Sequence, residues 1–454
     1  MLGWEFPPFI SGGLGTACHG LTRALSRQHT TITFVLPRSV ASETHDTATD
    51  VRILSPQSLT AQANGLATSQ LTSTALGHKP QPSNFTNVIF KTIPSRLTNP
   101  YQSPAKEHGG LTTADTPGGT TNLTQAATTH RSINNRSNST ADSHYGGDLL
   151  QEIRRYASMC VQLAHNEFFD VVHAHDWMTY PAGMAIAAVT GKPLVVHVHS
   201  TEFDRSGPNV NRAVYDIERR GMHAACCIIA VSYMTKSIVE HRYGITGDKI
   251  EVVYNGIDNG HTQPITPRTE IRRGDKIVLF LGRITMQKGP EYFVEAARKV
   301  LKKYDTVKFV MAGSGDMVRE VIDLAEQRGI GQKVIFTGFL RGPDVERVFK
   351  MADVYVMPSV SEPFGIAPLE AIRHDVPVVI SKQSGVSEVL THVLKVDFWD
   401  TDEIANKIIA VLRHPPLSST LREHADLEVR RLTWDDAAAK CRNVYRQAIA
   451  MMPV

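Results

Sequence analysis

Short apolar runs rich in Val, Ile and Phe alternate along the chain with longer amphipathic stretches. Strand-length runs separated by helix-length segments are typical of βαβ units and of a parallel sheet. In the first half, strands are expected at Thr31–Leu36, Val88–Ile93, Val171–Ala174, Leu194–His199, Cys227–Val231 and Ile250–Tyr254. In the second half, they are expected at Ile277–Gly282, Val307–Ala312, Val334–Thr337, Val354–Met357 and Pro377–Ile380. The chain is therefore expected to be an α/β protein built from doubly wound sheets.

The alternation stops once, near Asn255-Gly256-Ile257-Asp258, and resumes at Lys276 after a polar Thr/Pro/Arg segment. With 454 residues, the chain has room for more than one core. We expect an N-terminal domain over 1–256, a C-terminal domain over 257–433 and a C-terminal helix over 434–454. Two such domains, facing each other across a cleft, would bind ligands at the carboxyl ends of their strands.

One region departs from this pattern. Residues 102–145 are dominated by Thr, Ser, Asn, Gly and Ala. Such a segment cannot bury enough apolar surface to offset the entropy lost on ordering. We expect it to be a disordered, low-complexity insertion in a surface loop, and residues 40–82 to be only partly ordered.

Composition excludes several classes of protein. The formal net charge of +3 is small for a chain of this size, so it does not indicate a nucleic acid or an anionic membrane as a partner. Five cysteines without a repeated spacing argue against a disulfide framework or a zinc site, and favour free thiols in a reducing compartment. The N-terminus lacks the pattern of a signal peptide, and no apolar run reaches membrane-spanning length. A cytoplasmic protein without a transmembrane segment is expected.

Two polar turns are candidates for binding phosphate. Gly12-Gly13-Leu14-Gly15 precedes an expected helix at Thr16–Arg27, and its glycines would expose backbone amides to phosphate oxygens. A plain tight turn is an equally good interpretation, because the spacing is neither a dinucleotide fingerprint nor a P-loop. Arg283 and Lys288 follow the strand ending at Gly282, where two cations could neutralise the leaving diphosphate of an activated sugar. Solvated surface charges are the alternative.

The motif His173-Ala174-His175-Asp176-Trp177 follows another strand. Histidines two apart on a strand point the same way, so two metal ligands are possible, but no third ligand with a recognisable spacing follows. We therefore predict no metal and no cofactor. A carboxylate and an aromatic face suit a sugar, so Asp176 and Trp177 are expected to bind one. His197 and His199 repeat the arrangement one strand later; a structural role is the more common one, although His199 would open into the same cleft.

Glu362 and Glu370 are separated by a loop with a glycine and a proline. Proline is well tolerated at the first helical position, so a helix is expected to begin there with Glu370 in its first turn. The N–H groups of that terminus, at Gly365, Ile366 and Ala367, would face an anion. Glu370 could accept hydrogen bonds from sugar hydroxyls. A capping glutamate after an ordinary loop is the alternative.

Taken in order, these segments resemble the retaining glycosyltransferases with two Rossmann-like domains, the GT-B enzymes of group 1 and family 4 that include glycogen and starch synthases. The matching pieces are Gly12–Gly15, His173–Trp177, Val198-His199, Asn255–Asp258, Gly282-Arg283 with Gln287-Lys288-Gly289, Gly313–Gly315 and Glu362–Glu370. They cover the chain except roughly residues 40–85 and 102–145. Any one of them is weak evidence, whereas all of them in the family's order are specific.

The resemblance implies how the donor would be held. Arg283 and Lys288 would bind the diphosphate of a nucleotide sugar, assisted by the backbone at Gly13 and Gly15 and by the amides near Ile366. Glu370 would bind the ribose of the nucleotide.

The resemblance also implies roles around the transferred sugar. Glu362 would contact this sugar, and His199 would lie beside its reacting carbon. Asp176 and Trp177 would orient hydroxyls of the donor or of a carbohydrate acceptor. Members of the family retain the anomeric configuration without a metal, through attack on the face that the diphosphate leaves.

The expected activity is transfer of glucose from ADP- or UDP-glucose to an α-glucan. A relative that acts on a lipid, a small sugar or a sugar phosphate, a nucleotide-sugar epimerase, and an inactive nucleotide-sugar-binding protein are the alternatives. Bacterial glycogen synthases usually carry a lysine where this chain has Ile10, which loosens the link to that branch. Only Met1–Phe6 precede the glycine turn, so the first strand is very short or residues upstream are missing. Asp400-Thr401-Asp402 matches a metal pattern of other sugar transferases, but we interpret it as a helix cap.

Overall fold

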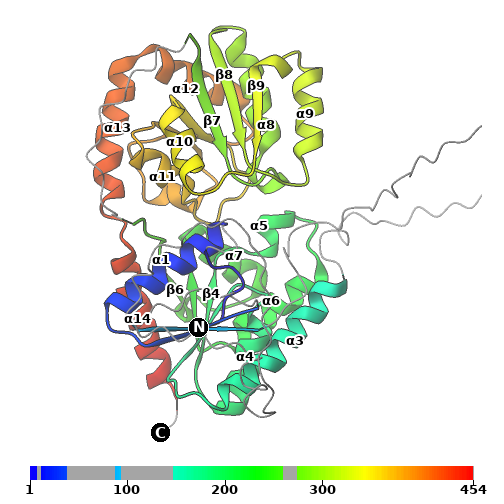
Figure 1. Ribbon diagram of the computed structural model, residues 1–454, viewed down its shortest axis with the longest axis vertical. Helices are drawn as coiled ribbons and strands as arrows, with labels where there is room; N and C mark the ends of the chain where they lie inside the picture. Colours follow the sequence, from blue (N-terminus) through cyan, green and yellow to red (C-terminus); the bar gives the residue numbers. More distant parts are fainter. Residues whose placement is uncertain (8–11, 38–86, 94–146, 259–273, 453–454) are drawn as a thin grey trace, which may run out of the picture.

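The computed structural model describes residues 1–7, 12–37, 87–93, 147–258 and 274–452, in two α/β lobes stacked along the long axis of the molecule (Figure 1). All strand pairs within its sheets are parallel. The predictions for residues 40–82, for the 102–145 insertion, for Ile10 and for the exact boundary segment after Asp258 fall wholly or largely outside the described residues.

The N-terminal lobe is built on a parallel sheet whose strands follow the predicted apolar runs. Strand order is β1-β2 in one part and β3-β4-β5-β6 in the other. The strands are β1 (Ile32–Leu36), β2 (Val88–Thr92), β3 (Val172–His175), β4 (Leu194–Val198), β5 (Cys227–Ala230) and β6 (Ile250–Val252). The helices are α1 (Gly13–Arg27), α3 (Gly147–Ala164), α4 (Tyr180–Thr190), α5 (Glu202–Ser206), α6 (Arg212–Ala224) and α7 (Tyr233–Tyr243), with the short turn η1 (Gly247–Lys249).

The first residues join the two parts of this sheet. Leu2 forms bridges to both Val35 and Ala174. Its N–H donates to the carbonyl of His173 at 2.8 Å, and its own carbonyl accepts from the N–H of His175 at 3.0 Å. The backbone at Leu2 therefore lies between β1 and β3 and bridges both strands.

The C-terminal lobe contains one six-stranded sheet in the order β12-β11-β10-β7-β8-β9. Its strands are β7 (Lys276–Leu281), β8 (Val307–Ala312), β9 (Val334–Gly338), β10 (Val354–Met357), β11 (Val378–Ser381) and β12 (Leu394–Val396). Helices cover both faces: α8 (Pro290–Leu301), α9 (Val318–Gln327), α10 (Pro343–Met351), α11 (Ala367–Arg373), α12 (Thr401–Arg413) and α13 (Pro415–Val429). The short turns are η2 (Met286–Lys288), η3 (Gly331–Lys333) and η4 (Gly385–Glu388). The predicted doubly wound architecture is thus present in both lobes.

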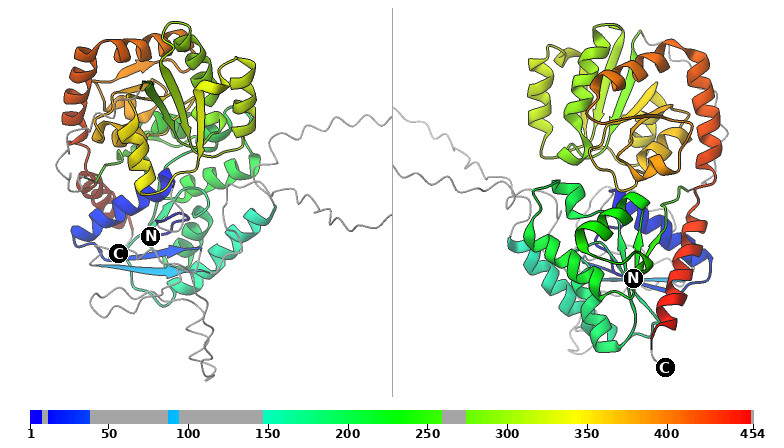
Figure 2. Two further views of the ribbon diagram at one scale, coloured as in Figure 1. Left: turned by 45° about the horizontal axis from the view of Figure 1, so that its top comes forward. Right: turned by 180° about the vertical axis from the view of Figure 1, so that it is seen from behind.

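The last helix crosses back to the first lobe. α14 (Trp434–Ala450) continues from α13 and lies along the N-terminal lobe, as the view from behind shows (Figure 2). Its buried face, which includes Trp434, Ala438, Cys441 and Tyr445, packs with α1 and β1 in one core. The sequence did not indicate which lobe this helix would contact; the structure places it on the N-terminal one.

Asp400 is the cap of α12, since its carboxylate accepts a hydrogen bond from the N–H of Glu403 at 2.8 Å. The prediction of a helix cap at this acidic triplet is confirmed.

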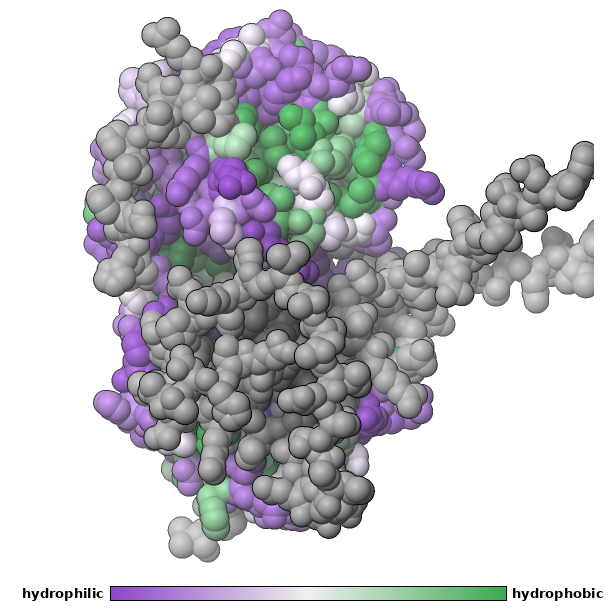
Figure 3. All heavy atoms as spheres, viewed as in Figure 1, coloured by the Kyte–Doolittle hydropathy of each residue, from purple (hydrophilic) through white to green (hydrophobic). Residues whose placement is uncertain are grey.

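Apolar side chains gather on one face of the C-terminal lobe, over β9 and α10 (Figure 3). Ile335 on β9 and Phe339 just after it are 46% and 50% exposed. β9 is an edge strand, so its outer side has no neighbouring strand in the described sheet. Within the described ranges, no helix combines the length and the apolar character needed to cross a membrane.

Candidate functional site

The loops after β7 and β8 lie against each other at the carboxyl edge of the C-terminal sheet. The N–H of Ile284 donates to the carbonyl of Ser314 at 2.9 Å. A Cβ on Gly313 would lie 1.8 Å from the carbonyl oxygen of Gly282, and one on Gly315 would lie 2.1 Å from that of Ile284. These glycines are therefore required for close approach of the two backbones. The approach fixes the start of the loop that carries the two predicted cations.

Lys288 lies in η2 of this loop and forms an ion pair with Glu362. Glu362 also accepts a hydrogen bond from the hydroxyl of Ser359 at 3.3 Å. The two loops are joined further by the N–H of Val360, which donates to the carbonyl of Gln287 at 2.9 Å. The structure thus brings together two predicted site residues that are 74 positions apart in the chain. Arg283, on the same loop, is exposed.

Glu362 is held by its own backbone. Its N–H donates to the carbonyl of Gln383, and its carbonyl accepts from the N–H of Gly385, both at 2.9 Å. The chain then turns at Gly365, whose φ of 102° favours glycine. α11 begins at Ala367 with Glu370 in its first turn, which agrees with the expected helix start.

Burial raises the pKa of Glu370 above its usual range. The hydroxyl of Tyr355 donates a hydrogen bond to the carbonyl of Leu281 at 3.3 Å. Burial raises the pKa of Tyr355, and the nearby carboxylates of Glu362 and Glu370 raise it further. The two glutamates therefore lie near the same tyrosine, at the base of the loop that bears Arg283.

The glycine turn of the N-terminal lobe opens α1, which starts at Gly13, earlier than predicted. Gly13 is exposed, and a Cβ on it would meet no described atom within 4 Å. Gly15 is buried, and its N–H donates to the carboxylate of Glu5. Of the two glycines, Gly13 is therefore the one open to a ligand, whereas the amide of Gly15 is engaged.

Glu5 is a site residue that the sequence reasoning missed. Glu5 is 5% exposed, and burial raises the pKa of its carboxyl. Arg283 from the other lobe and the N–H of Gly15 lower this pKa. A carboxylate in an otherwise apolar first strand was the available signal. Its electrostatic contact with Arg283 indicates that the glycine turn faces the loop after β7.

Asp176 occupies the left-handed region, with φ of 58°, directly after β3. Its carboxylate accepts hydrogen bonds from the N–H groups of His199 at 2.7 Å and Ser200 at 3.3 Å. Burial raises its pKa to about 7, although Arg205 and these two amides oppose the shift. In this position Asp176 orients the segment that follows β4. The carboxylate oxygen that accepts these two hydrogen bonds, Oδ1, is engaged by the backbone of the protein.

His199 lies where β4 ends and is partly buried. Its Nε2 lies 3.0 Å from Nδ1 of His175, within hydrogen-bond distance. Burial lowers its pKa to about 3, so the imidazole is neutral near pH 7. A neutral ring can hydrogen-bond to a sugar hydroxyl but cannot supply a positive charge.

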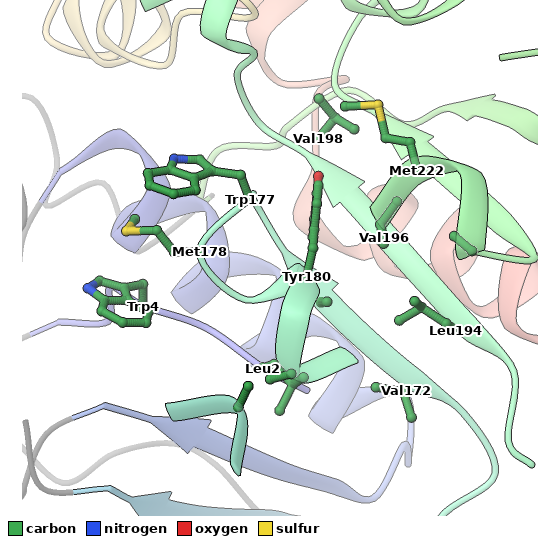
Figure 4. Close-up of a cluster of buried hydrophobic side chains, with 14 of the residues drawn as sticks. Leu2, Trp4, Val172, Trp177, Met178, Tyr180, Leu194, Val196, Val198 and Met222 are labelled. Atoms are coloured by element: carbon green, nitrogen blue, oxygen red, sulfur yellow. The ribbon is translucent and has the colours of Figure 1, made fainter. Parts of the chain in front are cut away.

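Trp177 is 1% exposed and lies in the core of the N-terminal lobe, in the same cluster as Trp4 and Met178 (Figure 4). A ring in that position does not offer its face to an acceptor. The expected role of Trp177 in orienting hydroxyls is therefore not supported by its place in the fold. The physical reason is that the chain turns at Asp176, which directs the next side chains inward.

Three contacts bring the two halves of the site together. The hydroxyl of Ser361 donates to the carboxylate of Asp204, on α5, at 2.5 Å. A Cβ on Gly207 would lie 3.7 Å from the methyl carbon of Met286 in η2. Glu388 accepts hydrogen bonds from the N–H groups of Tyr233 and Met234 at 2.9 and 2.8 Å, which caps α7 from the opposite lobe. The segments carrying His199 and Glu362 thus face each other.

The histidines also have neighbours that the spacing did not reveal. Ligand atoms of Cys18, His175 and His199 all lie within 4.8 Å of one another, as do those of His173, His175 and His197. The sequence shows no third ligand with a recognisable spacing, and these neighbours come from other elements, Cys18 from α1 and His199 from the residue after β4. Spacing along one strand cannot report a ligand supplied by another element.

Chemically, the C-terminal lobe offers the cations Arg283 and Lys288 and the carboxylates Glu362 and Glu370, and the N-terminal lobe offers exposed backbone at Gly13 and the neutral imidazole of His199. Cations and amides neutralise an anion that gains charge during a reaction. Carboxylates accept hydrogen bonds from hydroxyls. The arrangement fits a ligand that carries phosphate at one end and sugar hydroxyls at the other.

Family models match most of the chain. The model for glycosyl transferases group 1 matches residues 262–427, and the model for glycosyltransferase family 4 matches residues 134–260. An uncharacterized glycosyltransferase of Methanocaldococcus jannaschii is 36% identical over 301 residues, which are 63% of this chain and 77% of the relative.

Other relatives carry more specific names. A D-inositol 3-phosphate glycosyltransferase of Xylanimonas cellulosilytica is 29% identical over 315 residues, 63% of this chain and 74% of the relative. A glycogen synthase of Mycobacterium tuberculosis is 29% identical over 225 residues, 49% of this chain and 54% of the relative.

Among solved structures, that of Anabaena HepE in complex with UDP and glucose is similar with a TM-score of 0.65. The two chains share 16% of their residues, and the match covers 98% of each. At this identity the likeness concerns the fold.

Proposed function

The chain belongs to the group 1 glycosyltransferases with the GT-B fold, and from its cleft we propose that it transfers glucose from ADP- or UDP-glucose to an α-glucan with retention of configuration. The observation that carries the proposal is the Lys288–Glu362 ion pair at the carboxyl edge of the C-terminal sheet. The two loops that carry this ion pair are joined to the N-terminal lobe by the hydrogen bond between Ser361 and Asp204.

Arg283 and Lys288 bind the donor diphosphate in this proposal. Both lie on the loop after β7, where ligands of doubly wound sheets normally bind. When the diphosphate enters, it takes the place of Glu362 as a partner of the Lys288 ammonium. The exposed backbone at Gly13, across the cleft, and the amides at Gly365 to Ala367 add hydrogen-bond donors. Gly15 supports this turn through Glu5 instead of binding the donor directly.

Glu370 binds the ribose, and Glu362 contacts the transferred sugar. Both carboxylates lie near the Tyr355 hydroxyl, so ribose and sugar would lie on either side of the diphosphate. His199 lies beside the reacting carbon, as a neutral hydrogen-bonding group. Asp176 acts through His199 by holding its backbone.

The reaction in this proposal needs no acid or base from the protein. The bond between the anomeric carbon and the diphosphate oxygen breaks first, and the charge that develops on this oxygen is stabilised by Arg283 and Lys288. The acceptor hydroxyl then forms its bond on the same face of the sugar, and its proton passes to the departing diphosphate. The configuration at the anomeric carbon is thereby retained.

A second candidate acceptor is a sugar phosphate. It is favoured by the relatives named D-inositol 3-phosphate glycosyltransferase, of which one matches 63% of this chain. The donor half of the site would be the same in both cases. A cytoplasmic location is part of the proposal and is in keeping with five cysteines that are all free thiols.

The proposal is tested by measuring nucleotide release from the purified protein. ADP-, UDP- and GDP-sugars are each offered with glycogen, maltooligosaccharides, inositol phosphate and simple sugars, with and without a chelator. Release that depends on glycogen or maltooligosaccharide is expected, and release only with inositol phosphate would select the second candidate. Absence of release from every donor would exclude the enzyme, and loss of activity with the chelator would exclude a metal-free mechanism.

A further inference from the structure

Cys18, His175 and His199 form a buried group beneath the cleft that the transfer reaction does not use as a whole. They come from three elements: Cys18 from α1, His175 from β3, and His199 from the end of β4. Cys18 and His175 are fully buried, and His199 is partly buried. One thiol and two imidazoles are a ligand set that tetrahedral transition metals such as Zn²⁺ prefer.

The spacing of these three side chains is close to that of a metal site. Around a tetrahedral ion with bonds of about 2.0–2.3 Å, ligand atoms lie roughly 3.3–3.7 Å apart. Here the ligand atoms lie within 4.8 Å of one another, and Nδ1 of His175 lies 3.0 Å from Nε2 of His199.

Only some ring nitrogens at this place have a partner. Nδ1 of His175 and Nε2 of His199 lie within hydrogen-bond distance of each other, whereas in the described part of the chain the other nitrogen of each ring, Nε2 of His175 and Nδ1 of His199, is buried without one. Both ring nitrogens of His197, which stacks on His175 and His199, are in the same state. Buried polar atoms without partners are uncommon and costly, so their concentration here points to a missing ligand.

The surroundings are suited to a cation. Asp176 and Glu5 are both buried and both act electrostatically on the Cys18 thiol. Lys288 lies in the opposite lobe, and Arg283 from that lobe acts electrostatically on Glu5. A dication that displaces the thiol proton adds one net positive charge among these carboxylates. Behind the ligands, His173 stacks on His197 and contacts the Tyr445 hydroxyl at 2.7 Å, which holds the layer of rings in place.

We propose that Cys18, His175 and His199 form a binding site for a Zn²⁺-class transition-metal ion, and that an ion bound there inhibits glycosyl transfer. Binding forms bonds from the metal to one sulfur and two nitrogens and releases one proton from the thiol. The ion reaches the site through the cleft, where His199 is partly exposed. Inhibition rests on the proposed function, because the ion occupies the imidazole that would otherwise contact the sugar.

The binding half is tested with tag-free protein and Co²⁺, followed by visible and near-ultraviolet absorption. Wild type is expected to show a thiolate-to-cobalt charge-transfer band that is removed by an equimolar amount of Zn²⁺. Cys18→Ser should lose the band and bind Zn²⁺ at least about 100-fold more weakly. A variant with Cys226→Ser and Cys227→Ser, which removes the partly buried Cys226 and the buried Cys227 at the start of β5, should keep the band.

X-ray absorption of wild-type protein with one equivalent of Zn²⁺ makes the test independent of any variant's folding. One sulfur and at least two imidazoles in the first shell are expected. A shell without sulfur, no cobalt band in wild type, or a band that persists in a folded Cys18→Ser protein would overturn the site.

The proposed inhibition is tested by measuring nucleotide release at increasing concentrations of Zn²⁺. Wild type and the Cys226/Cys227 variant should lose activity at the concentration at which Zn²⁺ binds, and chelator should restore it. Equal inhibition of Cys18→Ser would overturn the assignment. If Co²⁺ binds as expected but no donor is turned over at all, the metal site stands and the proposed function fails.

Discussion

Among single residues, the Lys288 ammonium is the most important for the proposed transfer. In the structure it is paired with Glu362 in a site that is only partly exposed, and a diphosphate would compete for it. Lys288→Ala is expected to lower the turnover number by about two orders of magnitude or more, because it removes a charge that stabilises the leaving group. Steady-state nucleotide release checks this.

The matched control is Lys350→Ala, which removes an exposed lysine that pairs with Glu346 on α10. Its turnover should equal that of wild type. An unchanged rate in Lys288→Ala would mean that this lysine is a structural partner of Glu362 and takes no part in transfer.

Glu370 gives a pH-dependent prediction. Burial raises the pKa of its carboxyl, so it gains a proton at a higher pH than an ordinary glutamate as the solution is acidified. Only the ionised form accepts two hydrogen bonds from ribose, so the KM for the donor should rise in mild acid. Glu370→Gln should weaken donor binding at neutral pH and flatten this limb of the KM profile. A profile identical to wild type would exclude Glu370 as the ribose ligand.

The same shift has a consequence for stability. Because the pKa of Glu370 is raised in the folded state, this carboxyl contributes stability at low pH that is lost as the pH rises through the folded-state pKa. Glu370→Gln should therefore be at least as stable as wild type at neutral pH, which separates loss of donor binding from unfolding.

The sequence singled out Arg283, Lys288, Glu362 and Glu370 because charged residues at strand ends and helix starts have few other local uses. The structure places Lys288 beside Glu362, and the roles of these residues in transfer stay predictions. Glu5 and Cys18 were missed, since their importance comes from contacts with Gly15 and His199, which only the fold creates. Trp177 was misplaced because a motif does not report which way the chain turns after it.

At the scale of elements, the contact between α1 and α14 unites the two ends of the described chain. An ideal Cβ on Gly20 would lie 2.2 Å from the ring of Trp434. Gly20→Ala should therefore push α14 away from α1 and destabilise the N-terminal lobe by about 1–3 kcal/mol. Thermal unfolding followed by circular dichroism measures this.

Gly274→Ala serves as the control, because a Cβ there would meet no described atom within 4 Å. Its unfolding midpoint should match that of wild type. Equal midpoints for all three proteins would mean that α14 is held by other contacts than the packing of Trp434 on Gly20.

Most strands followed from apolar periodicity, and the last helix begins at Trp434, where it was expected. β12 was missed because three residues, Leu394–Val396, are too few to form a recognisable run. The return of α14 to the N-terminal lobe was open for another reason: an amphipathic face specifies that a helix is buried, but not which core it completes.

At the scale of the whole molecule, polar and apolar contacts join the lobes, since Val231 packs in a core of the C-terminal lobe and Tyr254 lies against Phe364. Ser361–Asp204 and the cap of α7 by Glu388 join them near the site. We expect the lobes to close further over a nucleotide sugar, because its ligands come from both halves. Small-angle scattering should report a smaller radius of gyration with donor than without. Superimposable profiles at saturating donor would count against closure.

The family, the enzyme class and the two-lobed fold were all predictable from the order of the motifs, and the comparisons confirm them. The acceptor was not predictable, because the residues that would select it are not part of the donor motifs. The surface that selects an acceptor is set by loop shape, which periodicity does not encode.

The central claim is that the cleft transfers a sugar from a nucleotide with retention of configuration. The most direct measurement is nuclear magnetic resonance of the product formed from ¹³C-labelled UDP- or ADP-glucose and a maltooligosaccharide. The account predicts a new α-glycosidic linkage in wild type and its loss in Lys288→Ala. A β-linked product, or hydrolysis of the donor without transfer to any acceptor, would contradict it.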